Sequence, residues 1–155
     1  MTTLDRITQL LSERAISFRL LHHQATRTSE ESAAVRGEAL EVGAKAIVMK
    51  TGGHFALFVI SAARRIDGRK IRAHLGVKKT RFATPDELMD LTGLVPGSVP
   101  PFGRPILDMD LYVDTSVQAN DRVAFNAGSL TDSIIMDAAD YFSLIDATIF
   151  DFAHD

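Results

Sequence analysis

The sequence predicts an α/β (α+β) fold in which helices surround a mixed, barrel-like β-sheet. Segments with strand character are interleaved with segments of helical spacing, but without the regular strand–helix–strand repeat of a doubly wound sheet. Of the 155 residues, 46% are hydrophobic and 24% are charged, a composition typical of a globular domain with a sizeable core. We therefore expect residues 1–155 to form a single domain.

Hydrophobic spacing and capping residues predict five helices. They cover residues 3–15, 28–36, 67–75, 84–92 and 137–145. The fourth has a complete start signal, because Thr84 can act as the N-cap, a proline follows it and Glu87 completes a capping box. Thr28 and Glu31 show the same capping-box pattern, and we expect Asp137 to cap the last helix.

Apolar runs predict the strands. They cover residues 17–21, 44–49, 55–60, 80–83, 105–114, 122–126 and 133–136. The second and third runs flank Gly52-Gly53, which is the signature of a β-hairpin. Because both runs are apolar on both faces, we expect the hairpin to lie deep in a sheet that is covered on each side.

Residues 91–103 (LTGLVPGSVPPFG), the proline–glycine loop, contain three prolines and three glycines and cannot continue a helix or a central strand. Their apolar residues should pack down and make the loop rigid. Gly97 permits a close backbone approach, and we expect the N–H groups of Ser98 and Val99 to be free. Free amides on a rigid loop suit the binding of a carbonyl or an oxyanion. The alternative is a structural crossover that binds nothing.

Lys45 is the hardest residue to explain structurally. By strand alternation it shares a face with Ile47 and Met49, so its ammonium starts from an apolar neighbourhood. Two explanations remain open. The side chain extends from the start of the strand to water, or it reaches into a cleft that holds an anion or a substrate carbonyl.

The net charge of −3 argues against a general nucleic-acid coat protein but leaves room for a local basic patch. Basic residues cluster in one short segment: Arg64, Arg65, Arg69, Lys70, Arg72, Lys78, Lys79 and Arg81. Such a run is either a solvated face or a docking surface for a polyanion.

Composition and the N-terminal sequence argue against thiol-dependent, secreted and membrane-spanning classes of protein. The chain has no cysteine, which excludes disulfides, a thiolate nucleophile and a thiolate zinc site. The N-terminus lacks the basic-then-apolar order of a signal peptide, and no apolar run approaches the ~20 residues of a membrane span. We therefore expect a cytoplasmic protein without a membrane partner.

The sequence shows no metal-binding pattern. His22 and His23 are adjacent and would point to opposite faces of a strand, while His54, His74 and His154 have no spacing partner. No Ser/His/Asp order is recognisable either. The segment Asn126-Ala-Gly-Ser129 ends a strand in a turn, where Asn and Ser usually cap their own backbone.

Taken together, these motifs resemble the YbaK and prolyl-tRNA-synthetase-associated editing-domain family of aminoacyl-tRNA deacylases. The resemblance runs from about residue 28 to residue 145. Its carriers, in order, are Thr28–Glu31, Gly43–Val48, the run Gly76–Leu88, the proline–glycine loop and Phe125–Ser129. The order and spacing of these pieces are more specific than any one of them.

The resemblance implies a fold and an activity. Members have a mixed-sheet, barrel-like α/β fold and hydrolyse the ester between a mischarged amino acid and the terminal adenosine of tRNA. Catalysis in the family depends mainly on positioning: the loop backbone holds the aminoacyl group, and the substrate's own hydroxyl assists the attacking water. This mechanism agrees with the absence of a recognisable protein nucleophile in the sequence. In the family a strand lysine, matched by Lys45, and a glycine-x-x-x-proline loop, matched by Gly97 to Pro101, form the pocket.

On this resemblance we assign catalytic roles to Lys45, Gly97, Ser98, Val99 and Pro101. We assign substrate binding to Thr28, Ile47, Pro100, Phe102, Asn126, Gly128 and Ser129, and weak RNA binding to Arg69, Lys70, Lys78 and Lys79. No metal or other cofactor is expected. The expected partners are the aminoacylated 3′ end of tRNA and an aminoacyl-tRNA synthetase, but not DNA.

One departure from the family limits the transfer of substrate selection. Some members carry a histidine directly after the Asn-Ala-Gly-Ser turn, where this chain has Leu130. The leading hypothesis is a trans-acting aminoacyl-tRNA deacylase with Lys45 as the cationic substrate contact. The alternative is a non-catalytic module of the same fold that binds an aminoacyl or nucleotide ligand and regulates a partner.

Overall fold

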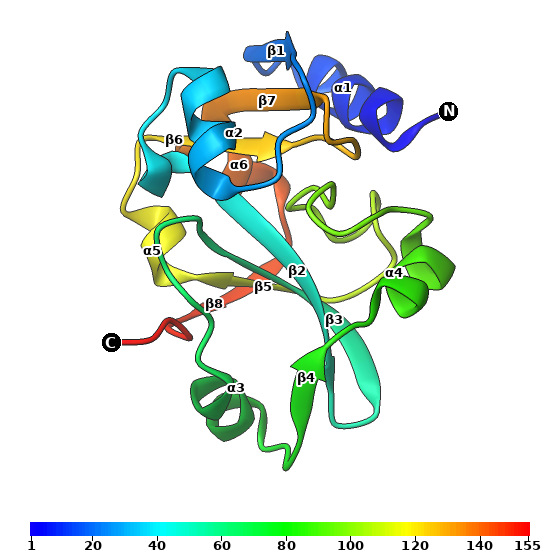
Figure 1. The fold of residues 1–155 in the computed structure, drawn as a ribbon, viewed down its shortest axis with the longest axis vertical. Helices are drawn as coiled ribbons and strands as arrows, with labels where there is room; N and C mark the ends of the chain where they lie inside the picture. The colour runs from blue at the N-terminus through cyan, green and yellow to red at the C-terminus, as the bar shows by residue number, and fades with distance from the viewer.

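The computed structural model describes residues 1–155 and has mixed α/β architecture (Figure 1). The helices are α1 (Thr3–Glu13), α2 (Ser29–Arg36), the short 3-10 helix η1 (Leu40–Val42), α3 (Gly68–Leu75), α4 (Pro85–Thr92), α5 (Thr115–Gln118) and α6 (Ala138–Leu144). The strands are β1 (Phe18–His22), β2 (Ala44–Thr51), β3 (His54–Ser61), β4 (Thr80–Phe82), β5 (Leu111–Asp114), β6 (Arg122–Asn126), β7 (Asp132–Asp137) and β8 (Ala147–Phe150). None of the helices is both long and apolar enough to cross a membrane.

The strands form two sheets. One has three strands in the order β1-β7-β6, and the other has five in the order β4-β2-β3-β5-β8, with β5 parallel to both of its neighbours. The two sheets meet at a single bridge between Gly43, just before β2, and Ala124 on β6. The predicted mixed α/β class is confirmed, although the sheets do not close into a barrel.

The long hairpin β2–β3 forms the centre of the molecule, as the sequence predicts (Figure 1). Thr51 pairs with His54 across the two-residue turn, and Gly52 takes a φ of 62°, which favours glycine. Alternate residues of β3 face two separate apolar clusters. Leu57 belongs to a cluster of 23 buried residues between the sheets, and Phe58 to one of 7 buried residues that includes Ile71 of α3. The hairpin is therefore covered on both faces.

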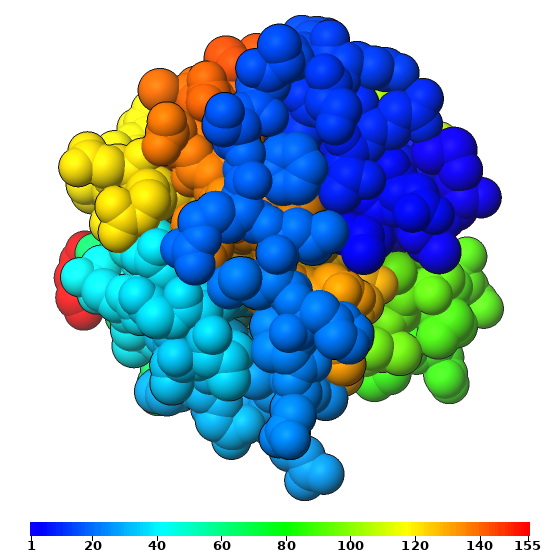
Figure 2. All heavy atoms as spheres, turned by 90° about the horizontal axis from the view of Figure 1, so that it is seen from above, coloured from blue at the N-terminus to red at the C-terminus, as the bar shows by residue number.

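The three-stranded sheet is covered from outside by the N-terminal segment. Figure 2 shows the chain from β1 into α2 crossing this end of the molecule beside α1. α1 contributes Ile7 and Leu11 to the larger cluster.

α2 begins at its N-cap Thr28, whose hydroxyl accepts the Glu31 N–H at 3.1 Å, and ends at Gly37. The Glu31 carboxylate accepts the N–H of Arg27 rather than that of Thr28, so only half of the predicted capping box forms.

The segment 105–114 does not form the long strand that the sequence predicts. Only Leu111–Asp114 is extended, because the preceding residues fold into turns in which Gly103 O accepts the N–H groups of Ile106 and Leu107. These turns bury the apolar residues of the segment without strand alternation. Arg104 holds the segment from outside through contacts to Asp108 and Asp110 at 2.9 and 2.8 Å.

Three short elements were not predicted, namely η1, α5 and β8. α5 depends on Asp114, which is fully buried and accepts the Ser116 N–H with one carboxylate oxygen and the Phe152 N–H with the other. β8 is a four-residue edge strand that pairs only with β5. α6 is confirmed over Ala138–Leu144, although its N-cap Asp137 makes no capping hydrogen bond.

The start of α4 gives a prediction about stability at low pH. The Glu87 carboxylate accepts hydrogen bonds from Arg81 at 2.7 and 3.0 Å and from the Thr84 N–H at 2.9 Å. These bonds lower its pKa from 4.5 to about 2. Because the folded-state pKa lies below the unfolded value, the stabilisation is complete above about pH 4.5 and is lost as the pH falls toward 2.

We expect Glu87→Gln to remove this part of the pH dependence. Thermal unfolding of both proteins between pH 2 and 6 checks the expectation, and the gap between their melting temperatures should shrink as the pH falls. The matched control is Asp86→Asn, because Asp86 lies in the same exposed turn and makes no hydrogen bond or ion pair. An unchanged gap across this range would contradict the assignment.

Candidate functional site

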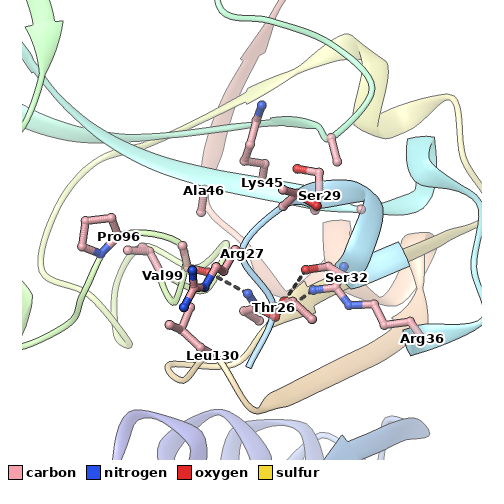
Figure 3. Close-up of a pocket in the computed structure, with 16 residues that line it drawn as sticks. Thr26, Arg27, Ser29, Ser32, Arg36, Lys45, Ala46, Pro96, Val99 and Leu130 are labelled. Carbon is pink, nitrogen blue, oxygen red and sulfur yellow. Dashed lines mark hydrogen bonds between the residues drawn. The ribbon is translucent and has the colours of Figure 1, made fainter. Parts of the chain in front are cut away.

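A pocket of about 430 Å³ opens where α2, the start of β2, the proline–glycine loop and the end of β6 meet (Figure 3). It is lined by residues 26–29, 32, 36, 43–46, 62, 96, 97, 99, 126 and 130. The pocket lies beside the bridge that joins the two sheets, at Gly43 and Ala124. Its walls therefore come from segments that are far apart in the sequence.

The pocket lining is cationic and rich in small hydroxyl groups. Arg27, Arg36 and Lys45 are its charged residues, and no Asp or Glu lines it. The hydroxyl side chains are Thr26, Thr28, Ser29 and Ser32. No His or Cys is present either, so the lining offers donors and positive charge but no evident base or thiolate.

The proline–glycine loop is anchored in the core by its second half. Phe102 packs edge-on against Phe125 and Tyr141, with ring centroids 5.4 and 5.5 Å apart. The Tyr141 hydroxyl, which is completely buried, donates to Pro101 O at 2.7 Å. This anchoring confirms that the loop is packed down.

The central peptides of the loop are held by the end of β6 and the turn that follows it. Asn126 Nδ2 donates to Gly97 O at 2.7 Å, and the Gly128 N–H donates to Ser98 O at 2.9 Å. In a trans peptide the N–H points opposite to the C=O. Since Ser98 O points at Gly128, the Val99 N–H points away from Gly128, and Val99 is one of the residues that line the pocket.

The free amides of the loop residues that line the pocket are therefore those of Gly97 and Val99, and the expectation for Ser98 was wrong. The Ser98 N–H donates to Val95 O at 3.1 Å, and the Ser98 hydroxyl exchanges two further hydrogen bonds with the Val95 backbone. Neither Gly97 N–H nor Val99 N–H has an acceptor within the protein. Pro96, Pro100 and Pro101 have no N–H to offer. The N–H groups of Phe102 and Gly103 also lack an acceptor, but these residues are buried at the anchored end of the loop and do not line the pocket.

Arg36 is a functional-site candidate that sequence reasoning missed. It is 7% exposed, and its Nε donates to Ser133 Oγ at 3.0 Å while Nη2 donates to Asn126 Oδ1 at 2.9 Å. No carboxylate lies within ion-pair distance of it, and burial lowers the pKa of the guanidinium from 12.5 to about 10. Arg36 therefore remains charged at neutral pH without a counterion. In the sequence it resembles any basic residue in the last turn of a helix.

Lys45 lies at the rim of the pocket. Figure 3 shows its ammonium on the opposite side of β2 from Ala46 and Val99. Nζ donates to Arg64 O at 3.4 Å and has no carboxylate partner. Burial lowers the pKa of Lys45, the charge of Arg65 lowers it further, and Glu30 acts in the opposite direction. Lys45 thus contributes to the pocket lining, while its ammonium contacts the Arg64 backbone on the other side of the strand.

Of the other predicted site residues, Thr28, Gly97, Val99 and Asn126 line the pocket. The remaining ones lie outside it: Ile47, Ser98, Pro100, Pro101, Phe102, Gly128 and Ser129. Ile47 packs against the cluster beneath α3, on the other face of the sheet from the core between the sheets. The two prolines and Phe102 are buried where the loop is anchored.

Gly128 and Ser129 have local structural roles that explain their position. Gly128 has a φ of 83°, and a Cβ there would lie 2.7 Å from the Thr3 side chain, so the turn packs tightly on α1. Ser129 Oγ donates to Asp132 Oδ2 at 2.8 Å and accepts the Thr131 N–H at 2.9 Å, which closes the turn into β7. Leu130 follows them and lines the pocket, 3.4 Å from the position of a Cβ on Gly97.

The predicted RNA-binding residues divide into two groups. Lys78 and Lys79 surround a basic groove of about 450 Å³ together with Lys50, Gly52, Arg72, Thr80 and Arg81. Lys70 lies elsewhere and binds Asp151, Asp155 and Ala153 O at the C-terminus, and Arg69 binds Asp67. Their charges are already engaged, so the structure does not bring Arg69 and Lys70 into the groove. No group of three or more metal-binding side chains comes together in the structure.

This fold and pocket define a class of protein: the chain belongs to the aminoacyl-tRNA editing domain family. The model of that family matches residues 23–144, which include the whole pocket and the basic groove. The family resemblance predicted from the sequence is thereby confirmed.

Individual relatives agree with this assignment. The chain is 35% identical over 156 residues to the multifunctional Ser/Thr-tRNA deacylase ProXp-y of Escherichia coli K12, covering 97% of this chain and 92% of that protein. It is 25% identical over 107 residues to the proline–tRNA ligase of Macrococcus caseolyticus, covering 69% of this chain and 18% of the ligase. A crystal structure described as a candidate trans-editing enzyme for prolyl-tRNA synthetase superposes with a TM-score of 0.86 at 25% identity, covering 100% of this chain and 99% of that one.

The different roles of Gly97 and Ser98 give a prediction about stability. Ser98 is 1% exposed, and Ser98→Ala leaves the Val95 N–H without its partner. We therefore expect the free energy of unfolding to fall by about 1 to 3 kcal/mol. Gly97→Ala forces an alanine to a φ of 87°, for which we expect a cost of about 1 kcal/mol. Denaturant unfolding of the two variants measures both values. If Ser98→Ala is as stable as the parent protein, the assigned hydroxyl contacts are wrong.

Proposed function

We propose that this protein is a trans-acting aminoacyl-tRNA deacylase, which hydrolyses the ester of a mischarged tRNA. The observation that carries the proposal is the pair of free amides at Gly97 and Val99, held by the rest of the fold at the wall of a cationic pocket. Family membership supports the reaction, and the likeness to stand-alone relatives along nearly the whole chain supports action in trans. A cytoplasmic location is part of the proposal, because the substrate is an intermediate of translation.

The proposed reaction needs positioning more than a protein nucleophile. The two amides hold the ester carbonyl and stabilise the negative charge that develops on its oxygen when water attacks the carbon. The bond between that carbon and the ribose oxygen breaks, and the ribose hydroxyl leaves with a proton from the water. Since no His, Asp, Glu or Cys lines the pocket, we assign activation of the water to the neighbouring hydroxyl of the substrate ribose.

We further propose that the amino acid removed is small and carries a hydroxyl group. The wall formed by Thr26, Thr28, Ser29 and Ser32 offers hydrogen bonds that an apolar side chain cannot use. Thr26 and Ser32 already bond to each other at 2.7 Å and can share those bonds with a ligand. A site built to bind a hydroxyl discriminates strongly against analogues that lack it. The relative from E. coli is named for seryl- and threonyl-tRNA, which supports this substrate class.

The basic groove is the proposed contact for the acceptor end of the tRNA. Lys45 at the pocket and Lys50 at the groove are five residues apart on β2, which corresponds to roughly 17 Å along a strand. An RNA end seated in the pocket would therefore place its following phosphates near the groove. We assign Lys45 to the phosphate of the terminal nucleotide, because the residue lines the pocket and its ammonium has no carboxylate partner.

Release of free amino acid from a panel of mischarged tRNAs tests the function. The panel contains seryl-, threonyl- and alanyl-tRNA of matched and mismatched tRNA species, each beside a sample without protein. We expect the seryl and threonyl esters to be hydrolysed fastest. If no ester in the panel is released faster than without protein, the chain is a binding module and not a deacylase.

We expect Lys45→Ala to leave the fold intact and to remove most of the activity. The apolar face of β2 does not require the charge, so the melting temperature should stay the same or rise. Deacylation rate and thermal melting are measured on the same sample. A loss of folding in proportion to the loss of activity would make Lys45 a structural residue. Lys70→Ala is a matched control, because that lysine is bound at the C-terminus, away from both the pocket and the groove.

We expect the groove to contribute RNA affinity and no chemistry. Removing one phosphate contact should weaken binding to all tRNAs and reduce the slope of log K against log salt by about 0.7 to 0.9 per contact. Lys78→Gln and Lys79→Gln are titrated with tRNA over a salt series, with Arg69→Gln as the control outside the groove. An unchanged slope in the lysine variants would show that the groove is only a solvated face.

A further inference from the structure

We infer that Arg36 is a positioning residue for the catalytic loop and acts through Asn126 on the peptide that follows Gly97. The inference rests on the proposed function, because it assumes that the loop amides bind the ester. Figure 3 shows the Arg36 side chain reaching from α2 into the pocket wall near Thr26 and Ser32. Arg36, Asn126 and Gly97 come from α2, β6 and the proline–glycine loop, and two hydrogen bonds connect them in a row.

The chemistry of the three groups allows only one direction for this row. A guanidinium can only donate, so the Asn126 atom that faces Arg36 must be the oxygen Oδ1. A backbone carbonyl can only accept, so the atom that faces Gly97 must be the nitrogen Nδ2. Arg36, together with the Ser133 hydroxyl that donates to the same oxygen at 3.3 Å, therefore favours the orientation of the Asn126 amide that provides the donor for the loop.

The hydrogen bond to Gly97 O orients a peptide next to both free amides. The peptide between Gly97 and Ser98 is rigid, and its carbonyl is held by Asn126 while its N–H is held by Val95 O. The free N–H groups of Gly97 and Val99 belong to the peptide planes on either side of this one. If the plane rotated, the spacing between these donors and the ester would change, and a displacement of about 1 Å can reduce a rate about a hundredfold.

The burial of Arg36 is difficult to explain by stability alone. The residue is 7% exposed, and Nε and Nη2 donate only to the neutral oxygens of Ser133 and Asn126, while Nη1 makes no hydrogen bond within the protein and is not fully buried. A buried charge without a counterion destabilises a fold, and an apolar residue of similar volume is often tolerated as well or better. A role in positioning the loop would explain why a buried charge that destabilises the fold is present at this site.

Single-turnover deacylation of seryl- and threonyl-tRNA tests the inference together with denaturant unfolding. Asn126→Asp keeps the acceptor for Arg36, and forms an ion pair with it, but cannot donate to Gly97 O. The new carboxylate oxygen would face Gly97 O and repel it, so we expect the loop to move and the rate to fall about a hundredfold, while the ion pair with Arg36 offsets the lost stability. We expect Arg36→Met to lose about tenfold or more, with Arg36→Lys intermediate and the concentration dependence on tRNA unchanged. The double variant Arg36→Met/Asn126→Ala should be no slower than Asn126→Ala alone.

Amide resonances of the free protein provide a readout that does not require activity. In ¹H–¹⁵N spectra we expect the Gly97, Ser98 and Val99 signals to shift in the Arg36 and Asn126 variants. The control is Arg122→Met, which breaks an ion pair with Glu38 at the other end of β6 and should leave these signals and the rate unchanged.

The possible outcomes are distinct. Unmoved loop amides in the Arg36 variants would overturn the inference, whatever the rates. A rate loss without an amide shift would show that Arg36 and Asn126 touch the substrate directly. If the parent protein hydrolyses neither ester, the proposed deacylase function fails, and the amide shifts alone decide whether Arg36 positions the loop.

Discussion

The attachment of the proline–glycine loop to the end of β6 is the constraint on which the site depends. Two hydrogen bonds, from Asn126 Nδ2 to Gly97 O and from the Gly128 N–H to Ser98 O, hold successive peptides of the loop. The prolines at 96, 100 and 101 contribute no N–H, the Ser98 N–H is held by Val95 O, and Phe102 fixes the far end in the core. Without this attachment the pocket would keep its shape on three sides but would lose the oriented amides that distinguish it from an ordinary surface cleft.

The same attachment explains why several loop residues are constrained without touching the pocket. Ser98 closes the turn with Val95, Pro101 accepts the Tyr141 hydroxyl, and Gly128 leaves room for Thr3. Each of these contacts supports the position of Gly97 and Val99. A substitution at such a residue would change activity through the geometry of the loop, so sensitivity to mutation alone does not identify the groups that meet the substrate.

The pocket concentrates positive charge where the fold supplies no negative partner. Arg36 is buried against neutral oxygens, and Lys45 has a pKa lowered by burial and by Arg65. Both arrangements destabilise the free protein and become favourable when an anionic or oxygen-rich ligand arrives. The terminal nucleotide of a tRNA is such a ligand, and the basic groove at the other end of β2 extends the same complementarity. The unpaired positive charges that destabilise the free protein are thus the same charges that would favour binding of the substrate.

Local chemistry made much of the fold predictable from the sequence. Capping residues predicted the bounds of α4 because a cap acts within one turn, and Gly52-Gly53 predicted the hairpin because the turn type depends on two residues. The same kind of signal marked the proline–glycine loop as rigid. Residues 105–114 were wrongly predicted as one strand, because apolar residues buried by turns have the same composition as those buried in a sheet.

The sequence by itself predicted the five longer helices, the central hairpin and the rigid loop, and its family resemblance placed Gly97, Val99, Asn126 and Lys45 near one site. Only the tertiary structure decided which amides are free, because the partner of the Ser98 N–H depends on how the turn closes. It also decided that Ile47 faces away from the pocket and that Arg36 faces into it. The side of a strand or helix that meets a ligand is set by contacts with segments ninety or more residues away, as between Arg36 and Asn126, and no local pattern records them.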